Sequence, residues 1–520
     1  MNKFLGDSMK KAVVILMFLT FISKILGFTR DITLSYFFGA TAISDVYIIS
    51  LTIPTVIFGI IGNGISSGLI PMYIQIESNY GTKKAHYFTN NILNFVILLC
   101  LIIFIICMLF TEPIVKLFAS GFVGESLNLA INFTRITMAG IFFTGIIYVL
   151  TPFLQIKRIF IITSLIGLPS NLIMIGSFFI GSQSNIYVLA FGSLIAIGSQ
   201  FLLICILSYK SNYRYSPRLD FKDSNMKKMF FLALPIILGS SVSQINILID
   251  RTLASRIVEG GISALNYAST LNLSVLGIAV SPIIAVLFPK ISRMVEKGNI
   301  EEMKMVLSSS INTITLLVFP ATVGFMLFAD PIIQLLFGRG EFDSLALLKT
   351  SQALFFYSIG LIGLCLRELF ANTFYSLHDT KTPMINATIA LIINIVLNIV
   401  LSWFMGLNGL ALATSIATLV GFMLLFNSLR KRIGNLVSKK SSISFLKIGF
   451  ASLIMGGVSK LAYNLLLNII NQSFSLLLAI FIGGVVYLAI ICAMKIVEIK
   501  MIAFEVKKIV QGISIVNKAA

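Results

Sequence analysis

Apolar stretches of roughly 20 residues recur along the whole of this chain, and they restrict its fold more than any other feature. A stretch of that length forms a helix that crosses a hydrocarbon core of about 30 Å. Only 11% of the 520 residues are charged, whereas soluble domains carry about 25%. Transmembrane β-barrels instead show short alternating segments. The sequence therefore predicts an all-α polytopic membrane protein.

We expect fourteen transmembrane helices. The first apolar block carries Lys24, ends at Arg30 and lacks a small-residue cleavage site. We therefore interpret it as a permanent helix and not as a signal peptide. The predicted ranges are 12–35, 44–70, 88–110, 128–151, 159–180, 185–208, 228–250, 264–288, 308–328, 350–375, 383–405, 408–428, 444–467 and 473–495.

The basic residues of the predicted loops and tails fall mainly on one side of the membrane, with 28 Lys and Arg there and five on the other side. Such an excess marks the cytoplasmic side, so we expect both termini in the cytoplasm. The net charge of +19 could suggest nucleic-acid binding, but the basic residues lie in loops between apolar blocks, as membrane topology predicts. We therefore expect no nucleic-acid binding.

Two basic linkers, 209–228 and 429–443, divide the predicted helices into groups of six, six and two. The segment Asp31-Ile-Thr-Leu recurs 219 residues later as Asp250-Arg-Thr-Leu. Two parallel six-helix halves are the expected product of a duplication. We predict an N-lobe at 1–225, a C-lobe at 226–440, related to it by a pseudo-two-fold axis, and two extra helices with a cytoplasmic tail at 441–520.

Ionisable residues inside the predicted helices are the candidates for substrate binding. A Lys, Arg or Asp at a helix centre costs roughly 2.5–3.5 kcal/mol, so it should face the protein interior or a wet cavity. A cavity lined by cations would hold an anionic substrate. Structural ion pairs and snorkelling side chains are the alternative. The candidates are Lys24, Arg30, Asp31, Asp45, Arg367 and Lys460.

Four further polar residues form a candidate Na⁺ site. Asn394 and Asn398 lie four residues apart, hence on one face of a helix. With Asp250 and Thr414 they would supply one carboxylate and several neutral oxygens, which suit a hard cation. Hydrogen bonding between helices is the alternative. The two histidines and five cysteines are too scattered for a zinc site or a catalytic triad, so we expect neither a catalytic residue nor a resident cofactor.

Several motifs along the chain carry a family resemblance. The most specific is Phe374-Tyr-Ser-Leu-His-Asp379-Thr-Lys-Thr-Pro383. The others are Ser23-Lys-Ile-Leu-Gly27-Phe28-Thr-Arg30-Asp31 with Phe38-Gly39-Ala40 and Asp45, Asp250-Arg-Thr-Leu-Ala-Ser255 with Ser263-Ala-Leu-Asn-Tyr267-Ala, Phe288-Pro289, and Gly338-Arg-Gly-Glu-Phe-Asp343. Over nearly its whole length the chain resembles the MurJ/MviN lipid II flippases.

The resemblance implies a fold of the multidrug/oligosaccharidyl-lipid/polysaccharide exporter superfamily, with two lobes around a central cationic cavity and a last helix pair that forms a groove for an undecaprenyl tail. It implies a non-enzymatic flippase of the bacterial cytoplasmic (inner) membrane that moves lipid II outward by alternating access, driven by an Na⁺ or H⁺ gradient or by the membrane potential. It also matches the candidate cation site. Cell-wall synthesis machinery is an expected partner.

The chain departs from the family pattern inside the expected cavity. Phe58 and Gly59 stand where the family places arginines in helix two, and Thr270 replaces an arginine in helix eight. The first-helix cation is Lys24, which lacks the bidentate fork of arginine. Another undecaprenyl-diphosphate glycan, such as a capsule, teichoic or exopolysaccharide unit, is therefore an alternative substrate. A cation-coupled drug exporter would be expected to have twelve helices, and a membrane glycosyltransferase would need larger outer loops.

Overall fold

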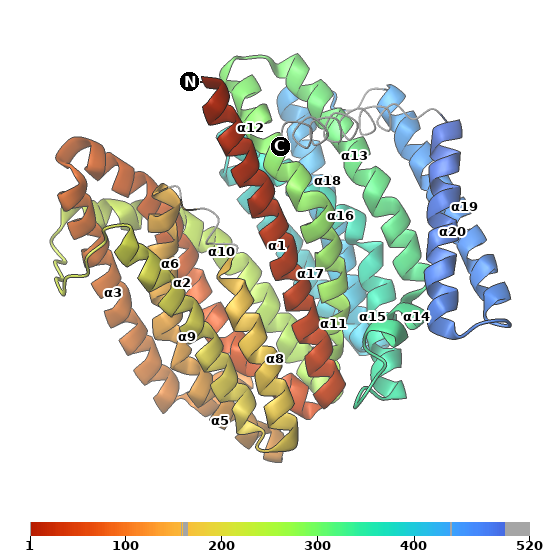
Figure 1. Ribbon diagram of the computed structural model, residues 1–520, viewed down its shortest axis with the longest axis horizontal. Helices are drawn as coiled ribbons and strands as arrows, with labels where there is room; N and C mark the ends of the chain where they lie inside the picture. Colours follow the sequence, from red (N-terminus) through yellow and green to blue (C-terminus); the bar gives the residue numbers. More distant parts are fainter. Residues whose placement is uncertain (1, 158, 160–164, 437–438, 495–520) are drawn as a thin grey trace, which may run out of the picture. The chain divides into compact units, whose positions relative to one another are not determined.

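The computed structural model describes residues 2–157, 159, 165–436 and 439–494, for residues 2–18, 439 and 440 as backbone alone. These residues form helices joined by short loops, and no strand occurs among them (Figure 1). The predicted start of the fifth helix, Arg158 and the basic C-terminal tail from Lys495 lie partly or wholly outside the described residues. The helices are α1 (Asn2–Phe38), α2 (Ala42–Tyr80), α3 (Thr82–Leu109), α4 (Thr111–Phe118), α5 (Gly124–Met138), α6 (Gly140–Ile156), α8 (Gly167–Gln183), α9 (Tyr187–Lys210), α10 (Ser224–Ile257), α11 (Gly261–Val275), the π-helix η1 (Leu276–Val280), α12 (Ser281–Glu296), α13 (Ile300–Leu327), α14 (Ala329–Leu336), α15 (Ser344–Ile359), α16 (Leu361–Ser376), α17 (Lys381–Met405), α18 (Leu407–Ile433), α19 (Lys439–Leu466) and α20 (Gln472–Ala493).

Ten of the described helices are long and apolar enough to cross a membrane, and two bent pairs raise this number to twelve. Of the remaining predicted spans, α8 has 17 residues and α1 is described in its first half by its backbone alone. The fold is thus an all-helical, multi-pass membrane protein, as predicted, while the count of fourteen spans stays a prediction.

The bent pairs recur at the spacing that the predicted internal duplication requires. The pair α5 and α6 bends by 42°, and the pair α15 and α16 bends by 47°. Their first residues lie 220 and 221 residues apart, and those of the short helices α4 and α14, eight residues each, lie 218 apart. At the second bend the Ser415 hydroxyl donates to the carbonyl of Phe356 (2.6 Å), near the end of α15. Polar capture of a carbonyl at a helix break explains a sharp kink.

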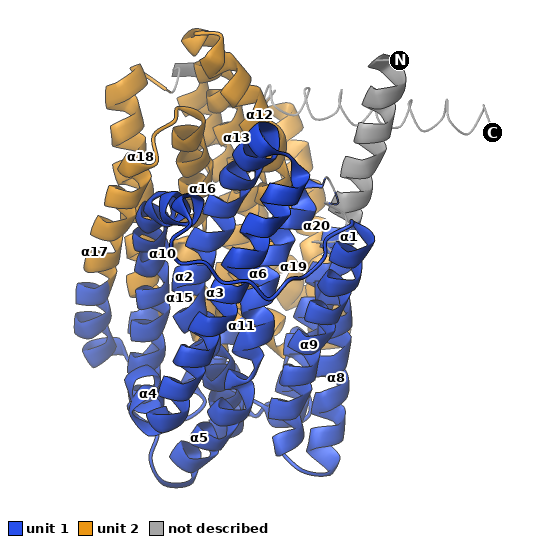
Figure 2. Ribbon diagram, turned by 90° about the vertical axis from the view of Figure 1, so that its left-hand side faces the viewer, with its two compact units in different colours: residues 1–267, 336–349, 395–410 blue, residues 268–335, 350–394, 411–520 orange. Residues whose placement is uncertain are grey.

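The chain forms two compact units, drawn in different colours in Figure 2. Unit 1 contains residues 1–267, 336–349 and 395–410, and unit 2 contains 268–335, 350–394 and 411–520. These units are defined by packing, whereas the predicted lobes are defined by the repeat. The lobe boundaries at 225 and 440 therefore stay a prediction.

Unit 1 is built around α2, which contacts α3, α5, α6 and α10. Glycines in the middle of α2 let its neighbours approach. A methyl group at Gly62 would touch the Tyr148 ring of α6 at 2.9 Å, and one at Gly68 would lie 3.2 Å from Met229 of α10. The helix continues without a break through this stretch. These glycines therefore serve close helix packing, as small residues do in membrane bundles.

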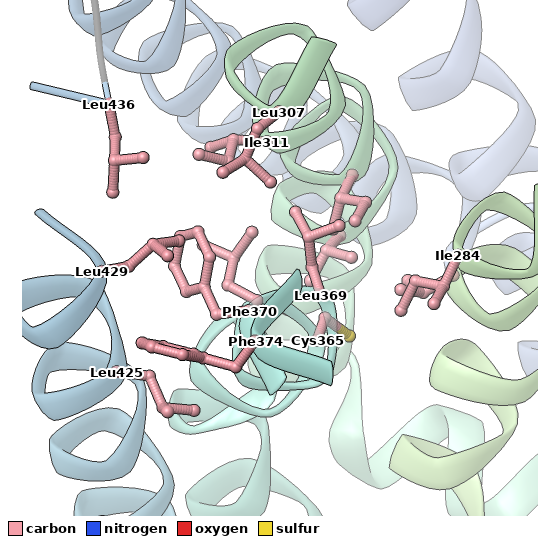
Figure 3. Packing of buried hydrophobic residues seen from close by; sticks show 14 of the residues in the cluster. Ile284, Leu307, Ile311, Cys365, Leu369, Phe370, Phe374, Leu425, Leu429 and Leu436 are labelled. Atoms are coloured by element: carbon pink, nitrogen blue, oxygen red, sulfur yellow. The ribbon is translucent and has the colours of Figure 1, made fainter. Parts of the chain in front are cut away.

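Unit 2 has an apolar core that joins α12, α13, α16 and α18. Phe370 and Phe374 of α16 lie at its centre, with Leu307 of α13 on one side and Leu425 of α18 on another (Figure 3). The last two helices, α19 and α20, pack on each other and on α13 through a separate cluster. A further cluster packs Tyr463, Leu476 and Ala479 of these two helices on Ile332 and Leu335 of α14.

Candidate functional site

The polar site on α1 is built from a pair of adjacent residues. Arg30 donates through Nε (3.0 Å) and Nη2 (2.7 Å) to Oδ1 of Asp31. Its Nη1 atom faces Asn171 Oδ1 at 3.5 Å and Met174 Sδ at 3.9 Å, both on α8. A third of the Arg30 side chain is exposed, whereas Asp31 is buried. Asp31 therefore fixes the guanidinium and leaves part of it accessible to an anion.

Lys24 lies six residues before Arg30 on the same helix. That spacing places the two side chains about 9 Å apart along the axis and about 120° apart around it. Lys24 is exposed, and it has no hydrogen-bond or ion-pair partner among the described residues. The two predicted cations are therefore on one helix but not on one face.

Asp45 has a different role from Asp31. Its carboxylate is buried and accepts hydrogen bonds from the backbone N–H and the hydroxyl of Ser263, both at 2.7 Å. Ser263 lies in the first turn of α11, where backbone N–H groups have no partner within the helix. The Tyr267 hydroxyl donates to the Gly39 carbonyl (3.1 Å) beside it. We refer to residues 36–45 as the α1–α2 corner, and Asp45 fastens this corner to α11.

The predicted cation site is partly assembled in unit 1. Asn398 Nδ2 donates to Asp250 Oδ1 (2.6 Å), and Asn246 Nδ2 donates to Asp250 Oδ2 (3.1 Å). Asn394 is buried on α17 and Thr414 is half-buried on α18, and both belong to unit 2. The described residues contain no group of three or more His, Cys, Asp and Glu side chains suited to a metal ion. An ion at Asp250 would have to use neutral amide oxygens as its other ligands.

Arg367 and Glu368 on α16 point in different directions, as adjacent helical residues must. Arg367 is half-buried, and a methyl group at Gly421 of α18 would lie 3.4 Å from its Cδ atom. Glu368 is exposed, and its carbonyl and carboxylate accept hydrogen bonds from Asn372.

Lys460 on α19 lies at the end of α13. Its ammonium group donates to the Leu327 carbonyl (3.2 Å) and lies 5.4 Å and 5.5 Å from the ring centres of Phe328 and Tyr463. A cation beside the last carbonyls of a helix is favourable because of the helix dipole.

The departures from the family pattern also have clear surroundings. Phe58 is fully buried and packs on the Tyr148 ring, with 5.6 Å between ring centres. A methyl group at Gly59 would lie 3.5 Å from the side-chain amide of Gln244 on α10. The Phe58 position offers no room for an arginine in this arrangement, whereas a methyl group at Gly59 would make only an ordinary contact.

Several contacts outside the apolar blocks were missed in the sequence. Lys157 pairs with Glu77 (2.9 Å), and although burial opposes it, hydrogen bonds to Glu77 and Tyr73 raise the pKa of Lys157. Asp379, inside the most specific motif, accepts from the backbone (2.9 Å) and hydroxyl (2.8 Å) of Thr382 and pairs with Arg432. Despite partial burial, these contacts hold the pKa of Asp379 below its usual range.

Three asparagines near the start of α3, Asn90, Asn91 and Asn94, were also missed. They bind the segment between α9 and α10. The sequence signal for these contacts is the occurrence of three side-chain amides within five residues, where the apolar stretch of α3 begins.

The family model for "Lipid II flippase MurJ" matches residues 34–480. The chain is 28% identical to the probable lipid II flippase MurJ of Vibrio cholerae, over 86% of this chain and 88% of that protein. It is 29% identical to the probable lipid II flippase MurJ of Thermotoga maritima, over 89% and 93% respectively.

Solved structures agree with the family model. A lipid II flippase MurJ in an inward closed conformation matches 92% of this chain and 98% of its own, with a TM-score of 0.81 and 29% identity. An inward-facing MATE-family multidrug transporter matches with a TM-score of 0.66 and 16% identity, over 81% and 98%. The second likeness shows a shared fold alone. The chain belongs to the lipid II flippase MurJ family.

Proposed function

We propose that this protein moves lipid II from the cytoplasmic to the outer leaflet of the bacterial inner membrane by alternating access. The observation that carries the proposal is the Arg30 guanidinium on α1, which Asp31 holds through two nitrogens while a third of the side chain stays exposed. A planar guanidinium matches the oxygens of a diphosphate. Membership of the MurJ family supports this substrate.

The test is growth of a bacterial strain depleted of its own lipid II flippase. The parent protein should restore growth, whereas Arg30→Ala and Lys24→Ala should not, although both accumulate in the membrane. Lys116→Ala is the matched control, because Lys116 is an exposed cation paired with Glu112 on the short helix α4. Growth with both α1 variants would contradict the proposal.

A second substrate class is favoured by the surroundings of Phe58 and Gly59, where the expected arginines are absent. With fewer cations on α2, the headgroup site would suit another undecaprenyl-diphosphate glycan. Flipping of purified lipid II and of a lipid-linked capsule precursor, measured in the same proteoliposomes, separates the two. A drug exporter is a weaker alternative, since it is supported by a shared fold at 16% identity alone.

Both termini are proposed to lie in the cytoplasm, because the predicted loops and tails of that side carry 28 of the basic residues. Reporter fusions after Ala520 and within 211–223 should both report the cytoplasm. A periplasmic signal at either point would contradict this topology. The cell-wall synthesis machinery is the proposed partner, because it would supply and use the proposed substrate.

Coupling to Na⁺ is proposed at Asp250. Both oxygens of its carboxylate accept amide N–H groups, from Asn398 and Asn246. If each amide turned by 180°, its oxygen would face the same space, and Asn394 and Thr414 are the proposed further ligands. Asp250→Asn should abolish any Na⁺ dependence of flipping in proteoliposomes. Unchanged Na⁺ dependence would contradict the site, and a dependence on pH alone would favour H⁺ coupling.

The helices α19 and α20 are proposed to hold the polyprenyl tail. They attach to unit 2 through α13, and many of their large apolar side chains are exposed, including Leu461, Leu465 and Phe481. A long tail is easier to keep in hydrocarbon than to enclose in a cavity. Lys460 is proposed to lie at the groove edge, near the diphosphate.

A further inference from the structure

The segment 211–223, which we call the linker, joins α9 to α10 and is bound along α3 (Figure 1). Asn91 makes two hydrogen bonds to one linker residue. Its Nδ2 donates to the Asp220 carbonyl (2.9 Å), and its Oδ1 accepts from the Asp220 N–H (2.7 Å). Asn94 Nδ2 donates to the carbonyls of Ser216 and Arg218, both at 2.9 Å.

Asn90 completes this asparagine cluster, defined as Asn90, Asn91 and Asn94. Its Oδ1 accepts from the Tyr213 hydroxyl (2.6 Å) and the Ser216 N–H (3.2 Å), and its Nδ2 donates to the Arg214 carbonyl (3.0 Å). Buried side-chain amides that both donate to and accept from the linker backbone fix the path of the linker. The linker is therefore part of unit 1 and is held in one conformation from Tyr213 to Asp220.

The asparagine cluster lies at the boundary of the hydrocarbon core. The 28 residues of α3 span about 42 Å, whereas a core of about 30 Å needs only about 20 residues. The stretch from Phe95 to Leu109 is apolar throughout, and the charged residues Lys83 and Lys84 lie before the cluster. Counted back from Leu109, the core ends near Asn90, so the linker is bound at the depth of the lipid headgroups.

At this depth the linker exposes two arginines without acidic partners. The guanidinium of Arg214 lies 3.8 Å from the centre of the Tyr209 ring, and that of Arg218 lies 5.9 Å from the Tyr87 ring. Neither forms an ion pair in the part of the chain that the structure describes. The nearby Asp220 instead accepts from the Lys222 N–H through its carboxylate. Arg214 Nη1 donates to the carbonyls of Tyr209 (3.0 Å) and Tyr213 (3.4 Å), so the rest of its guanidinium and that of Arg218 are available to an external anion.

The linker also exposes large apolar side chains. Tyr215 is 56% exposed, Phe221 55% and Leu219 39%. In water this exposure would be unfavourable, whereas aromatic side chains are enriched at the membrane interface. Arginines that can reach phosphates, combined with aromatic and aliphatic side chains at the same depth, are typical of a surface that binds anionic lipids.

We propose that the linker binds the phosphate headgroups of anionic phospholipids of the cytoplasmic leaflet, with the asparagine cluster holding Arg214 and Arg218 at headgroup depth. The inference rests on the proposed topology, which places the linker on the cytoplasmic side, and not on the identity of the transported substrate. Tyr215, Leu219 and Phe221 lie among the first methylenes of the acyl chains. The lipid supports the linker and α3 from the membrane side.

The test measures lipid retention by the full-length purified protein in native mass spectrometry, with phosphatidylglycerol, phosphatidylcholine and undecaprenyl diphosphate as probes. Removal of both charges in Arg214→Gln/Arg218→Gln should weaken phosphatidylglycerol binding about thirty-fold. The control Lys290→Gln/Lys297→Gln removes two exposed basic residues of the same predicted side from unit 2, outside the linker, and should weaken phosphatidylglycerol binding by a smaller factor than the arginine variant.

A third variant separates position from charge. Asn94→Leu keeps every basic residue and a similar side-chain volume, but it removes the two donors to the linker carbonyls. It should weaken phosphatidylglycerol binding several-fold while the protein still elutes as a folded species. Unchanged binding in this variant would refute the positioning role of the asparagine cluster.

Other outcomes overturn the proposal outright. Phosphatidylglycerol retention equal to the parent in the double arginine variant would do so, as would an equal loss in the lysine control. If the double arginine variant lost binding of undecaprenyl diphosphate alone, the linker would be a site for the substrate lipid instead. If the double arginine variant lost an acidic protein partner but kept phosphatidylglycerol, the linker would be a protein-binding surface. A periplasmic reporter signal within 211–223 would refute the topology, and this result is distinguishable from failed lipid binding.

Discussion

The turn at Gly260 offers a direct test of how the α1–α2 corner is closed. Gly260 adopts a φ of +75°, and a methyl group at this position would overlap the Ala40 carbonyl oxygen. Gly124 adopts a similar φ of +56°, but nothing lies within 4 Å of the place that its methyl group would take. Gly260→Ala and Gly124→Ala therefore share the backbone strain and differ in the contact.

The expected magnitudes follow from these two terms. Left-handed backbone costs a non-glycine residue roughly 1–2 kcal/mol, and both variants bear this cost. Overpacking against a fixed neighbour adds about 1–3 kcal/mol, and only Gly260→Ala bears it. If the corner relieves the overlap by moving away from the turn, the open arrangement gains about 5-fold to 150-fold in population.

The assay is the alkylation rate of a cysteine introduced at Ala264, which is fully buried beneath the corner. Gly260→Ala should raise this rate by the stated factor, whereas Gly124→Ala should leave it at the parent value. Ser263→Ala, which removes one of the two hydrogen bonds to Asp45, is a second variant with an expected smaller increase. Equal rates in all four proteins would refute the view that this contact holds the corner closed.

Three further predictions concern other parts of the chain. Arg30→Lys should reduce flipping at least tenfold at equal membrane levels, because an ammonium lacks the planar fork with which the guanidinium contacts Asp31 on one edge and could bind a phosphate on another; proteoliposome flipping measures this. Asp379→Asn should lower stability by up to about 1 kcal/mol at pH 7, because the amide removes the negative charge that pairs with Arg432 while its oxygen still accepts from Thr382. The pKa of Asp379 is lower in the folded state than its unfolded value of about 4. The stabilisation by the ionised carboxylate is therefore present above pH 4 and is lost as the pH falls through the folded-state pKa. The thermal unfolding temperatures of parent and variant should converge in acid. Truncation after residue 440 should leave an inserted, folded protein that fails to flip lipid-linked substrate; flipping at the parent rate would contradict the proposed tail groove.

Most of the fold could be predicted because hydropathy alone determines where a membrane helix lies. The predicted ranges 383–405 and 473–495 differ by two residues or fewer at each end from α17 and α20. The bends were not predictable. The prediction of one helix over 350–375 missed the break at Gly360, where the backbone approaches Ser415, because that contact depends on the packing of α18.

The candidate site shows the same division between local and long-range information. The pairing of Arg30 with Asp31 was considered from the sequence, because the two residues are adjacent. Asn171 lies 141 residues further along the chain, and its place beside Arg30 depends on the packing of α8 against α1. Likewise, Asp45 is a candidate for substrate binding in the sequence, and the structure gives it Ser263 as its partner. Charge and hydropathy identified ionisable residues in the membrane but not the neutral residues that hold them.

The packing around Phe58 explains why the cation content of α1 matters in this chain. Phe58 fills a space between α2 and α6 that depends on Gly145, whose added methyl group would lie 3.3 Å from the Phe58 ring. An arginine at this position would bring a charge into an apolar core without a partner, which is strongly unfavourable. A methyl group at Gly59 would lie in ordinary contact with Gln244 of α10, at 3.5 Å. With Phe58 committed to packing, α1 supplies positive charge for a diphosphate in unit 1: Arg30 is already oriented by Asp31, and Lys24 is exposed on another face.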